Sequence, residues 1–138
     1  MAGLAELLEA ERTCLAEALG TTSFTVSGVD DDHCRVGTDG LILHFYRRPG
    51  DWPLDSSLEF APPPVRDLPC ADHLHTWLVL RSRGEEWPAA RSETPITDEI
   101  ARVARAVSVV REETLLAEAL QWEAGYMNGF AAAAAPWD

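Results

Sequence analysis

Side chains that can bind a metal ion gather in one short segment, Cys70-Ala71-Asp72-His73-Leu74-His75. In a β-strand, residues two apart point to the same face, so His73 and His75 could share a metal ion with Cys70 nearby. The spacing matches no established ligand motif. We therefore keep Cys70, His73 and His75 as weak candidate ligands and expect neither a bound metal ion nor another cofactor.

A second segment combines carboxylates, an imidazole and a thiol in the run Asp30-Asp31-Asp32-His33-Cys34. A run of aspartates beside a turn is typical of solvated charge. Adjacent residues of a strand point to opposite faces, so His33 and Cys34 are not expected to form a nucleophile–base pair. The run is better suited to binding a charged partner than to catalysis.

Signatures of catalysis are missing from the amino-acid sequence. It contains no G-x-S-x-G, no G-x-G-x-x-G and no P-loop pattern. All 11 basic residues are arginine, which excludes a catalytic lysine or a Schiff base. The acidic pairs Glu85–Glu86 and Glu112–Glu113 are typical of solvated charges. We expect a protein that is not an enzyme.

The charge balance restricts the kinds of partner. The chain has 138 residues, and 23 acidic side chains against 11 basic ones give a net charge of −12. Nucleic acids and anionic membranes require a basic surface, so neither is expected as a partner. A negative field attracts basic proteins and speeds their association. Solubility alone is the alternative explanation of the charge.

Two tryptophans lie in predicted loops beside acids and prolines, Trp52 in Arg48–Pro53 and Trp87 in Gly84–Pro88. Aromatic anchors with charged neighbours are common in protein interfaces. The alternative is that each tryptophan folds back over the core. The candidate partner-binding residues are Asp30, Asp31, Asp32, Asp51, Trp52, Asp55, Glu85, Glu86 and Trp87.

The elements that must position these residues follow from the hydrophobic period. Apolar residues three and four apart predict an amphipathic helix over 3–19, ended by Gly20. Period-two segments then predict strands over 23–28, 34–36, 41–47, 57–60 and 73–83. Because the segment 41–47 is largely apolar on both faces, we expect it in the centre of the sheet.

A helical period returns over 98–123. A continuous helix of that length would span about 39 Å, longer than the core of such a small domain. We therefore expect a break near Arg111–Thr114. Gly125 and Gly129 are expected to end the helix.

The order of elements predicts an α+β fold. It consists of an N-terminal helix, a four- to five-stranded antiparallel sheet, and a long C-terminal helix or helix pair packed on one sheet face. The chain length suits one domain, expected over residues 1–130, with a loosely ordered tail at 131–138.

Cysteine usage and the N-terminal sequence predict a compartment. Cys14, Cys34 and Cys70 are an odd number without a closely spaced pair, unlike a disulfide framework. The first 25 residues are too acidic for a signal peptide, and no apolar run is long enough to span a membrane. We expect a cytoplasmic protein.

In layout, the chain resembles the small acidic immunity proteins of bacterial polymorphic toxin systems. The opening helix, the sheet segments Asp39–Phe45 and Ser57–Phe60, the segment Trp77–Leu80 and the long closing helix carry the resemblance. The lysine-free composition, rich in alanine and arginine, is similar to that of actinobacterial proteins. The resemblance implies a protein that neutralises a cognate toxin, expected to be a basic domain, by covering its active site.

Two alternatives stay open. Secretion chaperones have a similar α+β layout and acidity; they dimerise through an apolar face and hold an unfolded segment of a partner. A small metal-binding or enzymatic domain that uses Cys70, His73 and His75 is the other alternative.

Overall fold

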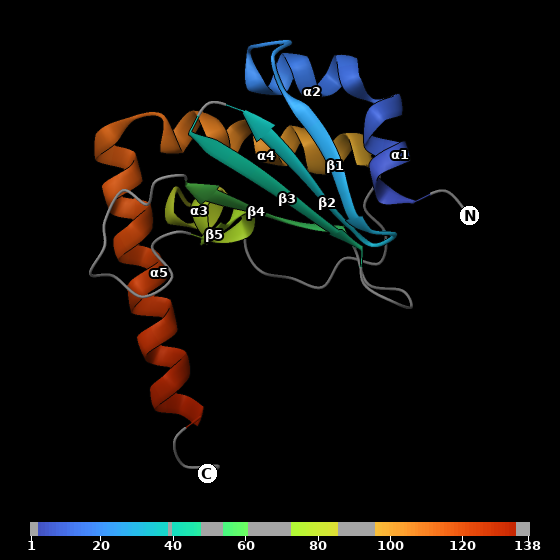
Figure 1. Cartoon of the computed structure of the whole chain (residues 1–138). Coiled ribbons are helices and arrows are strands. Elements are labelled where there is room, and N and C mark those ends of the chain that lie inside the picture. Colours follow the sequence, from blue (N-terminus) through green and yellow to red (C-terminus); the bar gives the residue numbers. More distant parts are fainter. Residues whose placement is uncertain (1–2, 39, 48–53, 61–72, 86–95, 135–138) are drawn as a thin grey trace.

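The computed structural model describes residues 3–38, 40–47, 54–60, 73–85 and 96–134 (Figure 1). The helices are α1 (Leu4–Ala10), α2 (Arg12–Leu19), α3 (Thr76–Ser82), α4 (Ile96–Val110) and α5 (Glu113–Ala134). The strands are β1 (Thr25–Asp30), β2 (His33–Thr38), β3 (Leu41–Arg47), β4 (Leu54–Phe60) and β5 (His73–His75). The α+β fold is therefore confirmed.

The five strands form one antiparallel sheet in the order β1-β2-β3-β4-β5. The central position of β3 confirms the prediction from its two apolar faces. At the turn between β2 and β3, Gly40 adopts φ +69°, a left-handed conformation that glycine accepts without steric cost.

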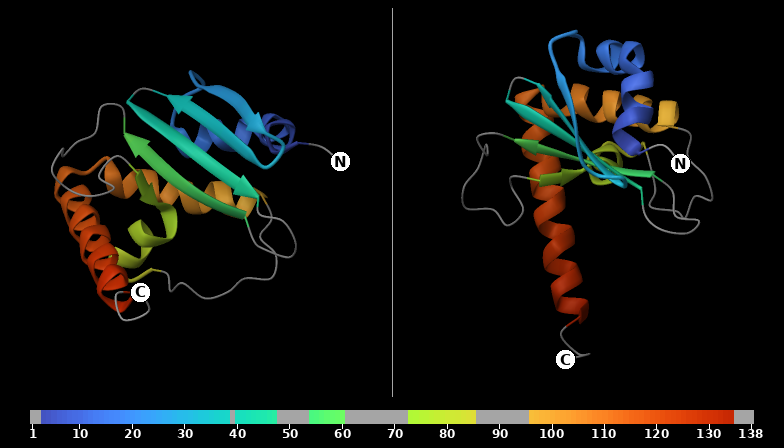
Figure 2. Two further views of the ribbon diagram at one scale, coloured as in Figure 1. Left: turned by 60° about the horizontal axis from the view of Figure 1, so that its bottom comes forward. Right: turned by 45° about the vertical axis from the view of Figure 1, so that its right-hand side comes forward.

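Helices α1, α3 and α4 lie against one face of the sheet, while α2 packs on α4 and α5 packs on α3 and α4 (Figure 2). There α1 packs on β1, β2 and β3, while α3 and α4 pack on β4. The core fills the space between these layers and includes Val36, Leu43, Phe45 and Leu58, which are fully buried. We call the opposite side of the sheet, which the described helices leave uncovered, the helix-free face.

The predicted N-terminal helix is two helices, so its continuity was predicted wrongly. Leu4 and Leu8 of α1 are buried where α1 packs on the sheet, whereas α2 packs on α4 through a different set of leucines. One straight helix cannot bury both sets, and the chain bends at Glu11. Gly20, with φ +70°, ends α2 as predicted.

The predicted strand over 73–83 is wrong beyond His75, where α3 begins. Thr76, Leu78 and Leu80 alternate as in a strand. Thr76, Val79 and Leu80, which are three and four residues apart, are buried on one face of a helix. A short apolar run has no period that separates the two structures. Contacts with α4 and α5 decide for the helix.

The predicted break in the C-terminal helix is confirmed, because α4 ends at Val110 and α5 begins at Glu113. The predicted stop at Gly125 and Gly129 is wrong, since α5 runs on to Ala134. Each glycine costs about 1 kcal/mol in a helix, and the alanines that follow are the best helix formers. The end of α5 projects away from the rest of the molecule (Figure 1). None of the described helices is long and apolar enough to cross a membrane.

Candidate functional site on the helix-free face

A row of acidic and aromatic residues crosses the helix-free face near one end of the strands. Asp30 of β1 pairs with His33 of β2, His33 pairs with Tyr46 of β3, and Tyr46 pairs with Asp55 of β4. Directly paired residues of antiparallel strands face the same side of a sheet. The rings of His33 and Tyr46 stack with centroids 4.5 Å apart. We call Asp30, His33, Tyr46 and Asp55 the docking row.

Next to the docking row, three side chains form a hydrogen-bonded chain, which we call the His33–His44–Glu59 chain. His33 Nε2 lies 2.9 Å from His44 Nδ1, and His44 Nε2 lies 2.7 Å from Glu59 Oε1. His44 is only 5% exposed, while His33 is half-buried. The group therefore runs from the interior of this face toward the solvent.

The carboxylate of Glu59 fixes the hydrogens of this chain. An ionised carboxylate only accepts hydrogen bonds, so His44 donates to Glu59 from Nε2. In a neutral His44 ring, Nδ1 then carries a lone pair and accepts the hydrogen of His33 Nε2. Nδ1 of His33 is the ring nitrogen that takes part in neither of these two contacts.

A shallow hollow of about 180 Å³ lies on the same face over β1, β2 and β3. It is lined by Thr25, Ser27, Arg35, Gly37 and Ile42. Arg35 is exposed, and its guanidinium group makes neither a hydrogen bond nor an ion pair with the described residues. Its guanidinium group can therefore bind an acidic group of a partner.

The aspartate turn beside the docking row is rigidly held. Asp32 N–H donates to Asp30 Oδ1 at 2.8 Å, which closes the turn between β1 and β2. Arg47 Nε donates to Asp32 Oδ1 at 3.0 Å, and Arg47 Nη2 donates to the carbonyl of Asp31 at 2.9 Å. Arg47 thus offsets part of the charge of the turn and leaves Asp30 and Asp31 exposed.

The structure brings some of the predicted partner-binding residues together. Asp30, Asp31 and Asp32 lie at one end of the docking row, and Asp55 lies at the other. Glu85 is not part of this group, because it follows α3, which packs against α4 and α5. The predicted residues Asp51, Trp52, Glu86 and Trp87 lie outside the described part of the chain.

The predicted metal ligands do not form a site among the described residues. Cys70 and the side chain of His73 lie outside them, and His75 is exposed with its ring 6.4 Å from that of Trp77. Where the structure describes the chain, no three His, Cys, Asp or Glu side chains are arranged to hold a metal ion. Cys34 is buried on the helix-covered side, away from His33, and desolvation raises the pKa of its thiol to about 11.

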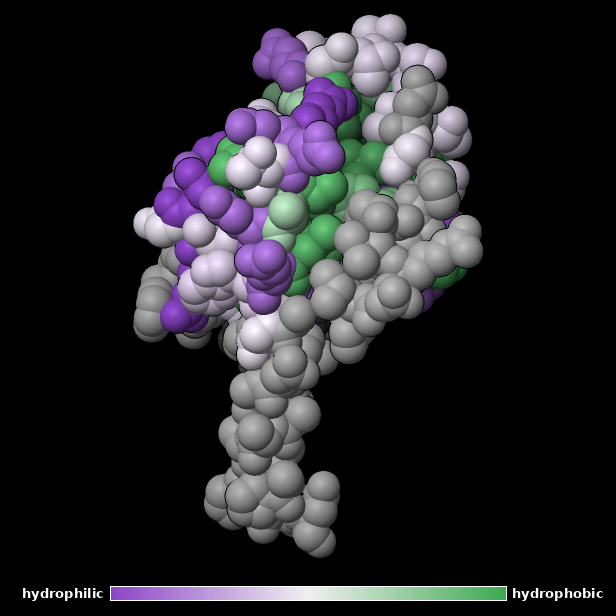
Figure 3. Space-filling view, turned by 90° about the vertical axis from the view of Figure 1, so that its left-hand side faces the viewer, coloured by the Kyte–Doolittle hydropathy of each residue, from purple (hydrophilic) through white to green (hydrophobic). Residues whose placement is uncertain are grey.

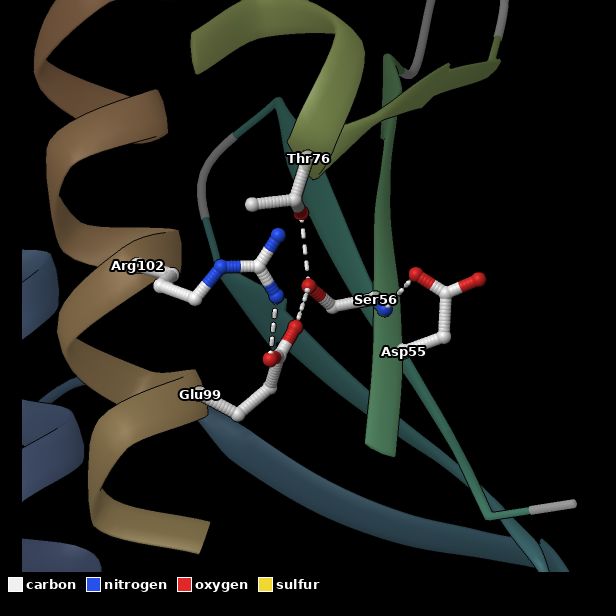
Figure 4. A network of polar contacts seen from close by, with 5 residues as sticks. All are labelled: Asp55, Ser56, Thr76, Glu99 and Arg102. Carbon is white, nitrogen blue, oxygen red and sulfur yellow. Dashed lines mark hydrogen bonds and ion pairs between the residues drawn. The ribbon is translucent and has the colours of Figure 1, made fainter. Parts of the chain in front are cut away.

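A second polar group lies between the sheet and the helices (Figure 4). Ser56 Oγ lies 2.6 Å from Glu99 Oε2 and 2.6 Å from Thr76 Oγ1, and Arg102 Nη1 donates to Glu99 Oε1 at 2.5 Å. A carboxylate cannot donate, so Ser56 donates to Glu99 and accepts from Thr76. Because Glu99 is fully buried, this network joins β4, α3 and α4 rather than meeting a partner.

A larger open hollow of about 520 Å³ lies between α3 and α5. Ser82, Glu118, Gln121, Trp122 and Gly125 line it. Trp122 is 40% exposed, and the guanidinium carbon of Arg81 lies 5.2 Å from the centre of its ring. Seen from the side on which α5 lies, the surface combines hydrophilic patches with a strip of apolar residues (Figure 3).

The sequence did not reveal the His33–His44–Glu59 chain as a unit. Its members are 11 and 15 residues apart, and only the register of three strands brings them together. The available signal was that His44 and Tyr46 interrupt the apolar segment 41–47 on the same face.

Fold and face together define an α+β protein with an antiparallel sheet covered by helices on one side. Comparisons of the chain with protein-family models, with curated proteins and with solved structures found no significant match. Its function is therefore inferred from its own side chains.

Proposed function

We propose that the chain is a binding protein that neutralises a cognate toxin by covering the active site of a basic toxin domain with its helix-free face. The docking row supports this proposal best. It places carboxylates at both ends of a stacked pair of rings, His33 and Tyr46.

This composition suits a protein interface. Aromatic rings supply apolar contact area in the centre, and charged groups at the rim select a partner of opposite sign. Asp30 and Asp31 are exposed at one end of the row, and Asp55 is half-buried at the other. The net charge of −12 adds long-range attraction for a basic domain.

A pull-down with the product of the neighbouring gene, combined with a toxicity-rescue assay, tests the proposal. We expect the full chain to bind that product and to restore growth of cells that express it. The variant Asp30→Asn/Asp55→Asn should bind and rescue less well, because it removes charge at both ends of the docking row. Absence of rescue for every genomic neighbour would refute the proposal.

A matched control uses another predicted partner-binding acid. Glu85→Gln also removes a negative charge, but Glu85 follows α3 instead of lying in the docking row. We expect this variant to bind and rescue like the unaltered chain. Equal losses in the control and in the double variant would point to overall charge rather than to the docking row.

The projecting end of α5 favours a second candidate function, that of a secretion chaperone. No charged residue lies between Glu123 and Asp138, and α5 extends into this uncharged stretch as far as Ala134. Such a helix suits a second copy of the chain as its partner. Light scattering after size-exclusion chromatography should then show a homodimer. Truncation after Ala124 should convert it to a monomer. A monomeric full chain argues against this candidate.

A further inference from the structure

We propose that the His33–His44–Glu59 chain makes binding at the docking row dependent on pH, so that a basic partner is held at neutral pH and released on acidification. This inference rests on the proposed function, because it concerns the same face. His33 belongs both to the docking row and to the hydrogen-bonded chain, which links the two.

In the starting state, each of the two contacts in the His33–His44–Glu59 chain has one donor and one acceptor. Glu59 accepts from His44 Nε2, and His44 Nδ1 accepts from His33 Nε2. With both rings neutral and the carboxylate ionised, the three side chains carry a charge of −1. A basic partner is attracted by this charge together with those of Asp30 and Asp55.

A first added proton fits without breaking a contact. It binds Nδ1 of His33, the ring nitrogen that does not take part in the contact with His44. Both hydrogen bonds are kept, and the charge of the three side chains changes from −1 to zero. The stacked ring of Tyr46, 4.5 Å away, accommodates the resulting cation.

A second added proton does not fit. It would have to bind His44 Nδ1, where its hydrogen would point at the hydrogen on His33 Nε2 across 2.9 Å. Alternatively it would bind Glu59 and weaken the contact with His44 Nε2. Stronger acidification therefore separates His33 from His44 and disturbs the docking row.

Charged groups on the neighbouring strands surround the His33–His44–Glu59 chain. Asp30 of β1 pairs with His33, and Asp55 of β4 pairs with Tyr46. Arg35 of β2 pairs with His44 and opposes a positive charge on that ring. Glu59 Oε1, 2.7 Å from His44 Nε2, favours a positive charge on the same ring.

A third histidine occupies the same face. His75 pairs with Ser57, which in turn pairs with His44, and the backbone of His73 pairs with Glu59. His33, His44 and His75 thus lie on the helix-free face. Imidazole groups change charge between about pH 5 and 8, so acidification makes this face less negative and weakens the attraction for a basic partner.

Binding of octaarginine to the full chain, measured by isothermal titration calorimetry, tests the inference. We expect the dissociation constant to rise about tenfold between pH 7.5 and pH 5.5, within the usual range of coupling between two equilibria. Amide chemical shifts should place the peptide over β1 to β4. An equal dissociation constant at both pH values, with the peptide on this face, would overturn the inference and leave the proposed function standing.

Two variants separate the His33–His44–Glu59 chain from the other histidines. His33→Gln keeps an N–H that can donate to His44 Nδ1 but removes the nitrogen that takes up the proton, so we expect the change with pH to fall to about twofold. His75→Gln removes an exposed histidine of the same face and should keep most of the tenfold change. The reverse pattern would overturn the inference.

The nitrogen chemical shifts of the imidazole rings supply a test without any partner. At pH 8 we expect His44 to carry hydrogen on Nε2 only, and on acidification we expect the first proton on His33. A His44 ring with hydrogen on Nδ1 at pH 8 would overturn the inference. If octaarginine binds at neither pH, the proposal of a basic partner is refuted. The nitrogen shifts still show which ring nitrogens of His33 and His44 carry hydrogen.

Discussion

Ser56 Oγ lies 2.6 Å from Glu99 Oε2 in the buried layer between β4 and α4. A serine of the sheet therefore supplies a hydrogen to a helical carboxylate that is fully buried. Arg102, one turn further along α4, balances the charge of Glu99. The helices that cover the sheet are thus held to it by polar contacts in addition to apolar ones.

Removal of one partner of this buried ion pair should be costly. We expect Glu99→Ala to lower the free energy of unfolding by about 3–5 kcal/mol, because it leaves the Arg102 cation buried without its carboxylate. Urea unfolding followed by circular dichroism measures the change. The double variant Glu99→Leu/Arg102→Met should recover most of the loss, and a double variant as unstable as the single one would contradict this role.

The buried thiol of Cys34 should affect stability at alkaline pH. Burial raises its pKa from the ordinary 9.0 to about 11, so the folded chain favours the protonated thiol. The resulting stabilisation is complete below about pH 9 and is lost as pH rises toward 11. Unfolding at pH 8, 9, 10 and 11 should show the unaltered chain losing stability relative to Cys34→Ala, and a constant difference would contradict the burial of this thiol.

The end of α2 should depend on glycine. Gly20 has φ +70°, so we expect Gly20→Ala to lower the free energy of unfolding by about 1 kcal/mol. Gly37 is a suitable control, because a Cβ there would meet no atom within 4 Å and its φ is not positive. Thermal unfolding should show a lower melting temperature for Gly20→Ala and little change for Gly37→Ala; equal shifts would contradict the helix end at Gly20.

Hydrophobic period was sufficient to predict the class of the fold and the centre of the sheet. The segment 41–47 alternates two apolar faces, and β3 lies between β2 and β4 as that pattern requires. Period failed at residues 76–82, because Thr76, Leu78 and Leu80 alternate as in a strand, whereas Thr76, Val79 and Leu80 share one face of a helix. The helix there depends on packing against α4 and α5, which lie far along the chain.

The candidate site could be predicted only in part. The acidity of Asp30, Asp31 and Asp32 is visible in the sequence and suggested a surface for a basic partner. Their position relative to Asp55 is not visible in the sequence, because it depends on the register of four strands. Asp55, expected in a loop, lies in β4, which begins at Leu54 instead of Ser57.

Affinity for the product of the neighbouring gene, measured for the unaltered chain and for Tyr46→Ala, tests most directly whether the helix-free face binds the partner. Tyr46 lies between His33 and Asp55 in the docking row, so loss of its ring should weaken binding at least about tenfold, as expected for an aromatic anchor. An unchanged affinity for Tyr46→Ala, with the fold intact by circular dichroism, would contradict the assignment of this face.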